Sequence, residues 1–271
     1  MESTPVSLGP KPYGVSPSRV NQIETCPRQY QYSTIQRLPE RKKMETYRGT
    51  VFHAILEEMF NRTAETPEER TLDYALALMR EIFRGLVTQE FAEEMGIDEQ
   101  GIQVFGRDLA KYIRTYFTME DPTQVVNEGI EIEMKADMGG WILKGILDRL
   151  DRDDKGNLII VDYKTGKVPG DKYKASALLP AKIYAYLCET VLGERPTEIR
   201  LLYVQFGKTL VVEVTDEDVT YADKRVREAW AKIENWYDLQ FFPPVPNNLC
   251  EKWCSFKEIC PVFAVPEYSP F

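Results

Sequence analysis

The sequence of 271 residues predicts a protein of the α/β (α+β) class, with a mixed sheet core flanked by helices. Residues 125–137 alternate apolar and polar side chains, as in a strand with one buried face. Residues 158–161 are all apolar, which is typical of a strand covered on both faces. Helical periodicity precedes these strands and returns after them. The expected order is a helical region, a three-strand meander, a helix, two strands and a helix.

The N-terminal region has the signals of several helices. Ser16 followed by Pro17 is an N-cap with proline at the first helical position, so a short helix is expected to end near Cys26-Pro27. Three longer helices should follow: residues 46–62, a segment from the capping box at Thr66–Glu69 to about Glu94, and about 101–119.

The second half of the chain should supply the sheet. The turn residues Asp153-Asp154-Lys155-Gly156-Asn157 join the second and third strands into a hairpin. The other expected elements are a helix at about 175–192 that stops at Gly193, strands at 198–206 and 209–214, and a helix to about Tyr237. We interpret the chain as one unit with three parts: a helical region (1–124), a core (125–240) and a Cys-rich tail (241–271).

Composition and charge exclude several classes of protein. The longest apolar runs are far shorter than the roughly 20 residues that cross a bilayer, and residues 1–15 lack the basic start and apolar core of a secretory signal. We therefore expect a cytoplasmic protein with no membrane partner. A net charge of −9 argues against a general basic coat for nucleic-acid binding, but not against a local basic groove. Solvated loop charge is the simpler interpretation of each local basic cluster taken alone: Arg41-Lys42-Lys43 with Arg48, and Lys164, Lys167, Lys172 and Lys174.

Asp148, Asp162 and Lys164 are candidates for metal-dependent chemistry. A turn centred on Lys155 pairs positions whose numbers sum to 310, which sets Asp148 opposite Asp162. Lys164 lies two residues beyond Asp162 and shares its face of the strand. Two carboxylates so close repel each other unless a cation such as Mg²⁺ or Mn²⁺ lies between them. A lysine beside that cation can orient or deprotonate water, or neutralise a phosphate.

A simpler alternative exists for each of these residues. The hairpin tip could be solvated, with Lys164 paired to Asp162. The apolar run before Asp162 favours a site, because α/β sheets place their sites at strand ends. His53, the only histidine, lies at the rim of the apolar face of helix 46–62. A lone histidine is usually structural, although neutral imidazole is also a good ligand for Mn²⁺.

The five cysteines fall into two kinds. Cys188 is in the middle of a predicted helix and is interpreted as a packed core thiol. Cys250, Cys254 and Cys260 form a C-x3-C-x5-C pattern in the tail, and Cys26 is a distant fourth. Such a set fits either structural zinc or an iron–sulfur cluster, and the spacing alone does not decide between them. Unrelated thiols are a third interpretation, which the polar neighbours in the tail disfavour.

Several motifs, in this order, resemble those of the PD-(D/E)xK nuclease superfamily. They are Gly49-Thr50-Val51-Phe52-His53, Gly145-Ile146-Leu147-Asp148-Arg149 and Asp162-Tyr163-Lys164-Thr165-Gly166. More narrowly, Ser16-Pro17-Ser18-Arg19, Cys26-Pro27-Arg28 and the tail cysteines resemble the RecB-like branch with an iron–sulfur cluster, which includes the CRISPR adaptation nuclease and related phage exonucleases. The resemblance covers essentially the whole chain.

The resemblance implies a restriction-endonuclease-like core and a set of residue roles. His53, Asp148 and Asp162, with the Tyr163 carbonyl, would bind two Mg²⁺ or Mn²⁺ ions, and Lys164 would be the catalytic lysine. Cys26, Cys250, Cys254 and Cys260 would hold a [4Fe–4S] cluster, so that the tail closes an iron–sulfur site. The implied activity is metal-dependent DNA cleavage, commonly 5′→3′ on single strands, in a prokaryotic or phage-infected cell.

Two departures from that pattern have consequences. The branch usually has a glutamine four residues before the tyrosine that here is Tyr184, but position 180 is proline, so another group such as Lys182 would have to replace it. The tail begins C-x3-C where C-x2-C is usual, so the geometry or stability of a cluster would differ.

Three functions are consistent with these observations. The first is a DNA exonuclease for recombination, repair, replication or viral genome processing, in which aromatic residues such as Tyr30, Tyr32 and Tyr173 stack on bases or simply pack. The second is a processing nuclease that depends on a partner, a CRISPR integrase or a recombinase, as the low basicity suggests. The third is a non-catalytic DNA-binding scaffold, which only Pro180 supports and which the retained His53, Asp148, Asp162 and Lys164 disfavour.

Overall fold

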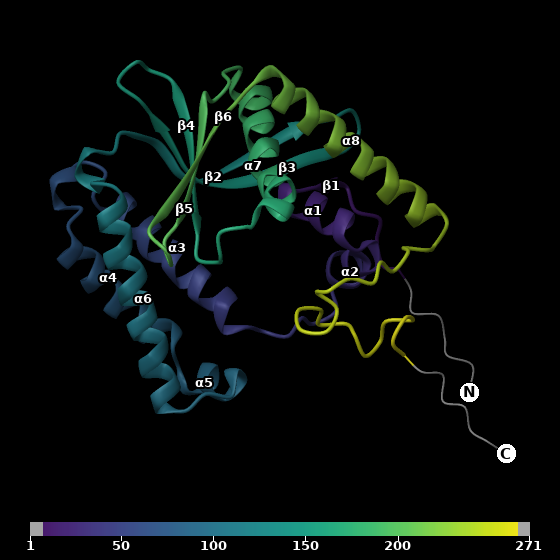
Figure 1. The fold of residues 1–271 in the computed structure, drawn as a ribbon, viewed down its shortest axis with the longest axis horizontal. Helices are drawn as coiled ribbons and strands as arrows, with labels where there is room; N and C mark the ends of the chain where they lie inside the picture. The colour runs from purple at the N-terminus through teal and green to yellow at the C-terminus, as the bar shows by residue number, and fades with distance from the viewer. Residues whose placement is uncertain (1–7, 265–271) are drawn as a thin grey trace.

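The computed structural model describes residues 8–264 as a mixed sheet between two layers of helices (Figure 1). The sheet has six strands in this part of the chain. They are β1 (Gly14–Val15), β2 (Asn127–Asp137), β3 (Ile142–Arg152), β4 (Leu158–Lys164), β5 (Glu198–Tyr203) and β6 (Lys208–Glu213). The helices are α1 (Pro17–Thr25), α2 (Pro27–Tyr30), α3 (Met44–Arg62), α4 (Leu72–Leu86), α5 (Gln89–Met95), α6 (Glu99–Met119), α7 (Asp171–Leu192) and α8 (Asp216–Asp238), with a π-helical turn at Gln31–Ile35 and 3₁₀ turns at Pro67–Glu69 and Pro122–Gln124.

The strand order confirms the predicted meander of β2, β3 and β4. These three strands pair antiparallel, β4 pairs parallel with β5, and β5 pairs antiparallel with β6. The crossover from β4 to β5 runs through α7, as a parallel pair requires. The short strand β1 pairs parallel with the start of β3, and the sequence did not predict it. The N-terminal region therefore contributes to the core sheet.

Two apolar cores lie on opposite faces of the sheet. One contains side chains of α1, α7 and α8, and the other contains side chains of α3, α4 and α6, which lie on the other side of the sheet in Figure 1. Along β4, Leu158 and Ile160 belong to the first core, and Ile159 and Val161 belong to the second. The prediction that 158–161 is covered on both faces is confirmed, because the alternation of a strand sends successive side chains to opposite cores.

The predicted hairpin register is confirmed where strands β3 and β4 pair. The pairs Arg149–Val161, Leu150–Ile160 and Arg152–Leu158 all sum to 310. The next pair in this register would be Asp148 with Asp162, but the ladder ends at Arg149–Val161. There the Tyr163 N–H donates to a side-chain oxygen of Asp148, at 2.7 Å. The carboxylate of Asp148 therefore joins the two strands at the point where their backbone pairing stops.

The single helix expected from Thr66 to about Glu94 is wrong. The segment contains a 3₁₀ turn, then α4, then α5. Two threonines begin the two helices, because the side chains of Thr71 and Thr88 accept hydrogen bonds from the backbone N–H three residues later. Arg70, between the 3₁₀ turn and α4, is buried and donates to the carbonyls of Pro122 and Val125.

The tail packs against the start of the chain. Asn247 donates to the carbonyl of Thr25 at 3.3 Å, and Tyr32 donates its hydroxyl proton to the carbonyl of Ile259 at 3.1 Å. Between residues 241 and 264 the structure has turns without a helix or strand. Residues 1–7 and 265–271 lie outside the described residues. They belong to the predicted regions 1–124 and 241–271, and residues 1–7 also belong to the segment 1–15, for which no secretory signal was expected. No helix within 8–264 combines the length and apolar character needed to span a membrane.

Candidate metal and catalytic site

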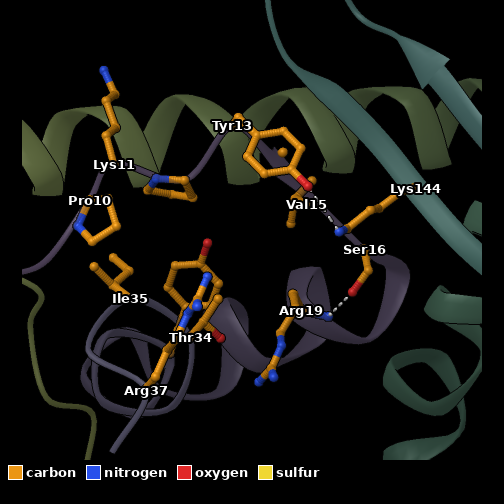
Figure 2. Close-up of a pocket in the computed structure, with 13 residues that line it drawn as sticks. Pro10, Lys11, Tyr13, Val15, Ser16, Arg19, Thr34, Ile35, Arg37 and Lys144 are labelled. Atoms are coloured by element: carbon orange, nitrogen blue, oxygen red, sulfur yellow. Dashed lines mark hydrogen bonds between the residues drawn. The ribbon is translucent and has the colours of Figure 1, made fainter.

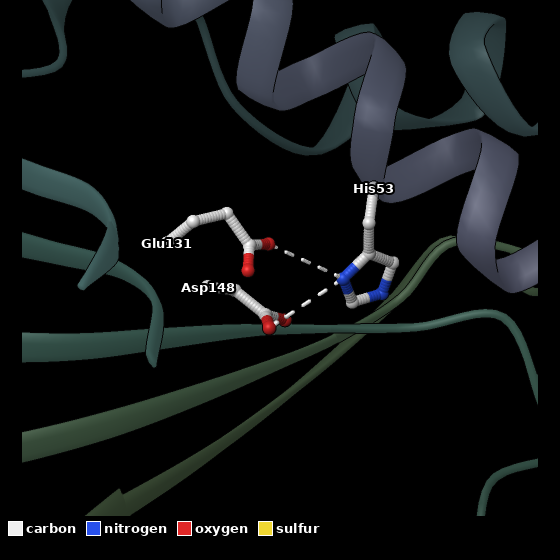
Figure 3. Close-up of side chains that lie close together, drawn as sticks. All are labelled: His53, Glu131 and Asp148. Atoms are coloured by element: carbon white, nitrogen blue, oxygen red, sulfur yellow. Dashed lines mark ion pairs between the residues drawn. The ribbon is translucent and has the colours of Figure 1, made fainter. Parts of the chain in front are cut away.

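Four elements bring the candidate site together where the pairing of β3 with β4 stops. Helix α3 supplies His53, β2 supplies Glu131, β3 supplies Asp148, and β4 supplies Asp162 with Lys164. Figure 3 shows the imidazole of His53 pointing from its helix toward the carboxylates of Glu131 and Asp148. Helix α3 approaches β4 closely, because a Cβ on Gly49 would lie 3.1 Å from the hydroxyl of Thr165.

His53, Glu131 and Asp148 form a compact group of possible metal ligands. One ligand atom of each lies within 4.8 Å of the others. The Nδ1 atom of His53 is 3.5 Å from Asp148 Oδ1 and 3.9 Å from Glu131 Oε1. Its Nε2 atom is 3.1 Å from the carbonyl oxygen of Tyr163. If Nε2–H donates to that carbonyl, the lone pair of Nδ1 faces the two carboxylates.

The charges in this group shift the pKa of its members. Burial lowers the pKa of His53, but the hydrogen bond and charge of Asp148 outweigh burial, so the pKa is raised. Burial and the charge of Asp148 raise the pKa of Glu131 to about 7. A carboxyl that holds a proton near neutral pH marks a place where negative charge exceeds local compensation.

Glu131 is the site residue that sequence reasoning missed. The alternation of 125–137 puts it on the polar side of β2 with Glu133 and Lys135. The β2–β3 pairs Ile130–Arg149 and Ile132–Leu147 place Glu131 across from Asp148. Its backbone φ of +47° lies in the left-handed region, which is uncommon for a residue other than glycine. Only the pairing of β2 with β3 could have identified it, because alternation alone places it on the solvent side.

Asp162 and Lys164 form an ion pair beside this group. The Lys164 Nζ atom is 2.5 Å from Asp162 Oδ2, and the Asp162 side chain is 14% exposed. Burial raises the pKa of Asp162, Lys164 lowers it, Asp148 raises it, and the result is a rise. The predicted trio Asp148, Asp162 and Lys164 is thus brought together, although Asp162 lies outside the compact ligand group. The pairing of Lys164 with Asp162 is also what the simpler alternative expected.

Tyr163 contributes its backbone to the candidate site and its side chain to the core. Its carbonyl oxygen faces His53, whereas its ring belongs to the core of α3, α4 and α6. The phenol oxygen accepts a hydrogen bond from Arg149 at 2.7 Å. The carbonyl is therefore available in the site while the side chain is structural.

The expected glutamine position and its proposed replacement lie on α7. Pro180 is inside this helix. Lys182 forms an ion pair with Asp218 of α8 at 2.6 Å, so its amine is already neutralised by another helix. Tyr184 lies near the site, because burial and then the charges of Asp162 and Asp148 raise the pKa of its hydroxyl. Gly145 of the second motif makes room for it, since a Cβ there would lie 2.6 Å from the Tyr184 ring.

Cys188 differs from the other four cysteines in its burial. Cys188 is fully buried, and burial raises the pKa of its thiol to about 12, which confirms a packed core thiol. The other four are partly exposed free thiols. Backbone N–H groups of Val245 and Asn247 donate to the sulfurs of Cys26 and Cys250.

The tail thiols and Cys26 are neighbours. Burial raises the pKa of Cys254, and the charges of Cys250, Cys26 and Cys260 raise it further. Within the described residues, however, no cysteine belongs to a group of three ligand atoms that lie within 4.8 Å of one another. The described residues therefore define no metal cluster at these four thiols.

A mixed sheet flanked by helices, with carboxylates and a lysine on adjacent strands, is the arrangement of a restriction-endonuclease-like nuclease core. The chain belongs to the PD-(D/E)XK nuclease superfamily, whose family model matches residues 14–261. This confirms the resemblance at the level of the superfamily.

Two phage proteins and one solved structure are similar to the chain. The Gene 69 protein of Mycobacterium phage D29 is 23% identical over 271 residues, which covers 92% of this chain and 96% of the phage protein. The Gene 69 protein of Mycobacterium phage L5 is 21% identical over 284 residues, with the same shares covered. A candidate exonuclease from Eubacterium rectale is 12% identical with a TM-score of 0.54, and the match covers 100% of this chain and 96% of that chain. At this identity the solved structure supports the fold alone.

Proposed function

We propose that this nuclease is a divalent-metal-dependent DNA exonuclease that acts on single strands or DNA ends. The observation that carries the proposal is the convergence of His53, Glu131 and Asp148, with Asp162 and Lys164 beside them. Three carboxylates face one lysine and one imidazole here, and a bound cation would balance that excess of negative charge.

The donor set fits Mg²⁺ or Mn²⁺. Both ions prefer oxygen ligands, and Mn²⁺ also accepts an imidazole nitrogen. We assign His53, Asp148 and Asp162 as ligands for up to two ions, with the Tyr163 carbonyl as a further ligand, and we add Glu131 to this set. When bound, the metal would activate water and stabilise charge on the phosphodiester.

Lys164 is the proposed catalytic lysine. Its amine is held at the strand end by Asp162, 2.5 Å away, and its side chain is 40% exposed, so it can reach both the ligand group and a substrate. From this place it can orient the attacking water or neutralise charge on the phosphate.

We also propose that Cys26, Cys250, Cys254 and Cys260 hold a [4Fe–4S] cluster, as in the RecB-like branch. The backbone N–H groups that donate to the sulfurs of Cys26 and Cys250 suit a cluster, because such hydrogen bonds tune iron–sulfur centres. Structural zinc is the alternative. Anaerobic purification followed by an absorbance spectrum and metal analysis separates the two, since only the cluster is brown and contains sulfide.

The three predicted parts of the chain would then act as one nuclease unit. The helical region 1–124 carries Cys26 and His53, the core 125–240 carries the acidic residues and Lys164, and the tail 241–271 completes the cysteine set. The pairing of β1 with β3 and the contacts of the tail with Thr25 and Tyr32 support a single unit.

A hollow next to the catalytic lysine suits an approaching DNA strand. It is about 570 Å³ and includes Thr165, Lys167, Arg48 and Trp253 in its lining. Trp253 is 50% exposed, and the Lys43 amine lies 4.9 Å from its ring centroid. An exposed aromatic ring among cations is the usual surface for single-stranded nucleic acid. The positive charge around this hollow is partly neutralised, because Arg48 pairs with Asp108 and Lys42 pairs with Glu94.

Cleavage of end-labelled DNA tests the proposal. The cluster-loaded protein should shorten single strands with Mg²⁺ or Mn²⁺ and leave them intact with a chelator. Labels at the 5′ or 3′ end report the polarity, for which the resemblance suggests 5′→3′. Lys164→Ala should abolish cleavage and Lys182→Ala, whose amine pairs with Asp218, should retain it. Intact strands with wild-type protein and either metal would reject the proposal.

A partner-dependent processing nuclease is the second candidate. The net charge of −9 favours it, since a partner such as a recombinase or a CRISPR integrase would then supply DNA binding. Weak cleavage alone and strong cleavage in a purified complex would distinguish it from the first. A non-catalytic scaffold is disfavoured, because the ligand group and Lys164 are all present and adjacent.

A further inference from the structure

A second hollow lies away from the acidic group, between β1, α1 and the segment that follows α2. It is about 450 Å³, within the range of pockets that hold small molecules. Its lining includes the cationic residues Lys11, Arg19, Arg37 and Lys144 and no acidic residue. Figure 2 shows the side chain of Arg37 extending into the hollow and that of Lys144 approaching it beside Tyr13.

Within residues 8–264 only Lys11 of these cations has an anionic partner; Arg19 instead donates to Gln22 and Ser33, and Arg37 and Lys144 form no ion pair. No carboxylate oxygen of the described chain lies within 4.0 Å of the Arg37 guanidinium or the Lys144 amine. The Lys144 amine is 3.4 Å from the Tyr13 hydroxyl and 5.4 Å from the centroid of its ring. Lys11, in contrast, forms ion pairs with Glu234 and Asp238. In a protein of net charge −9, uncompensated cations around a hollow indicate an anionic ligand.

The buried wall of the hollow has an unused hydrogen-bonding group. Tyr30 is 0% exposed and lines the hollow. Its hydroxyl has no hydrogen-bond partner among the described residues. A buried hydroxyl without a partner costs free energy unless a ligand or water bonds to it. The same wall contains the π-helical turn and Arg37, whose φ is +52°.

A second, smaller hollow adjoins this one on the side of β3. It shares Ser16 and Lys144 with the first hollow, and Glu133, Ile146 and Tyr184 also line it. The Tyr184 ring packs against Gly145, which precedes Asp148 by three residues on β3. Lys144 and Asp148 are four residues apart on β3, a distance of about 13 Å at the rise of a strand. A strand of nucleic acid a few nucleotides long can span that distance.

We propose that the hollow is a nucleotide subsite, in which Arg37 and Lys144 bind a phosphate of the substrate strand and Tyr13 stacks on a base. Tyr13 is 69% exposed, so its ring is available for stacking. This inference rests on the proposed function, because it takes the ligand to be part of the DNA substrate. It assigns the subsite to a position a few nucleotides from the scissile bond.

Binding without cleavage tests the subsite independently of catalysis. The full-length protein, free of divalent metal, is titrated into a 3′-fluorescein oligothymidylate of 12 nucleotides, and anisotropy gives the affinity. Arg37→Ala and Lys144→Ala should each weaken binding by about tenfold and reduce the slope of log K against log salt by about one. Tyr13→Ala should also weaken binding, and Tyr13→Phe should restore it.

A matched control comes from a different basic hollow. Arg107 and Arg114 line a hollow on the outer side of α6 that shares no residue with the first. Arg107→Ala and Arg114→Ala should bind within twofold of wild type. If Arg37→Ala, Lys144→Ala and Tyr13→Ala all bind as these controls do, the subsite is rejected. Melting temperatures identify a variant that does not fold, and the exposed Tyr13 and Arg37 keep the test valid if Lys144→Ala is lost.

Two further arms place the phosphate on the strand. Oligomers of 4 to 12 nucleotides should gain affinity at the length that reaches the hollow, and Arg37→Ala should remove that gain. Oligomers with and without a 5′-phosphate distinguish a terminal phosphate from an internal one, and either result supports the subsite. A gain with length that Arg37→Ala leaves unchanged would contradict it. Absence of cleavage by the wild type, with these binding results intact, would reject only the proposed exonuclease.

Discussion

Two clusters of charge lie next to each other on the same pair of strands and are built in opposite ways. Asp148 and Asp162 belong to the candidate site, and their chain neighbours Arg149 and Tyr163 belong to a buried network that packs against α3 and α6. In the site, carboxylates outnumber cations, and the pKa of Glu131 is raised to about 7. In the network, the charges compensate each other.

The buried network is centred on Arg149, which is 0% exposed. Its guanidinium donates to both carboxylate oxygens of Glu120, at 2.6 and 2.9 Å, and to Asp151 at 2.9 Å. It also donates to the hydroxyls of Tyr163 and Tyr116, at 2.7 and 3.3 Å. Burial lowers the pKa of Arg149, but the surrounding tyrosines and Glu120 outweigh it, so the guanidinium stays charged.

The contrast teaches that one strand can carry stability and function on alternate residues. The compensated cluster stabilises the position of β3 and β4, because its charge-assisted hydrogen bonds fix both strands. The uncompensated cluster is left to bind a cation. Each cluster should therefore respond differently to the same kind of substitution.

The largest effect is expected from Asp148→Asn. Removal of a ligand carboxylate should lower the cleavage rate by about 10³-fold or more, equivalent to about 4 kcal/mol in the barrier. Metal-free stability should be unchanged or higher, because like-charge repulsion with Glu131 falls and asparagine can still accept the Tyr163 N–H. Rate assays and urea unfolding check both parts. A large loss of metal-free stability would remove the contrast between the clusters.

Arg149→Met should have the opposite profile. Loss of the guanidinium leaves Glu120 and Asp151 without their main cation, which should cost about 3–5 kcal/mol in the free energy of unfolding. Arg152→Met is the matched control on the same strand: Arg152 pairs with Glu128 and Glu194 but its side chain is 31% exposed. The control should lose far less, because ion pairs in contact with solvent contribute little to stability. Equal losses in the two variants would contradict the structural role of the Arg149 network.

Metal binding should stabilise the wild type through the candidate site and not through the Arg149 network. At 100 times its dissociation constant, Mn²⁺ should add about 2.7 kcal/mol to the free energy of unfolding. The gain should disappear in His53→Ala and persist in Arg152→Met, which lies outside the ligand group. Calorimetric melting with and without Mn²⁺ provides the measurement. The same gain in His53→Ala would place the metal elsewhere.

The smallest effect concerns pH and the buried network. Burial raises the pKa of Glu120, but Arg149 outweighs burial, so the pKa is below the ordinary 4.5. An acid with a lowered pKa stabilises the fold above its unfolded-state value, and this contribution is lost as pH falls through the folded-state value. Wild type should exceed Glu120→Gln by up to about 2 kcal/mol at pH 7, and the difference should shrink below pH 4.5.

Asp151, a neighbouring carboxyl whose pKa shifts in the opposite direction, does not disturb this comparison. Burial raises the pKa of Asp151 above its ordinary value, so its contribution runs the other way. It is present in both proteins and cancels to first order in the difference. A difference between wild type and Glu120→Gln that stays constant from pH 7 to pH 3 would contradict the assignment.

The sequence predicted those features that depend on local pattern. The turn at 153–157 defined the register that aligns β3 with β4, and the apolar run 158–161 identified the doubly covered strand. The helix beginning at Ser16 followed from its cap and proline. From these features the proximity of Asp148, Asp162 and Lys164 could be inferred before any coordinates.

What the sequence did not predict depends on contacts between distant segments. Glu131 faces His53 because β2 pairs with β3 and its backbone enters the left-handed region. In the sequence Arg149 is only part of a motif, whereas its four hydrogen-bonding partners come from α6, the residue that follows α6, β3 and β4. The two-residue strand β1 is too short to have a periodicity. None of these has a signal within a window of neighbouring residues.

A crystal soaked in Mn²⁺ and measured at an anomalous wavelength tests the metal site most directly. We expect an anomalous peak at roughly 2.0–2.4 Å from oxygens of Asp148 and Asp162 and from a ring nitrogen of His53. A structure in which the Mn²⁺ peaks lie elsewhere, with these side chains still paired to one another and to Lys164, would contradict it.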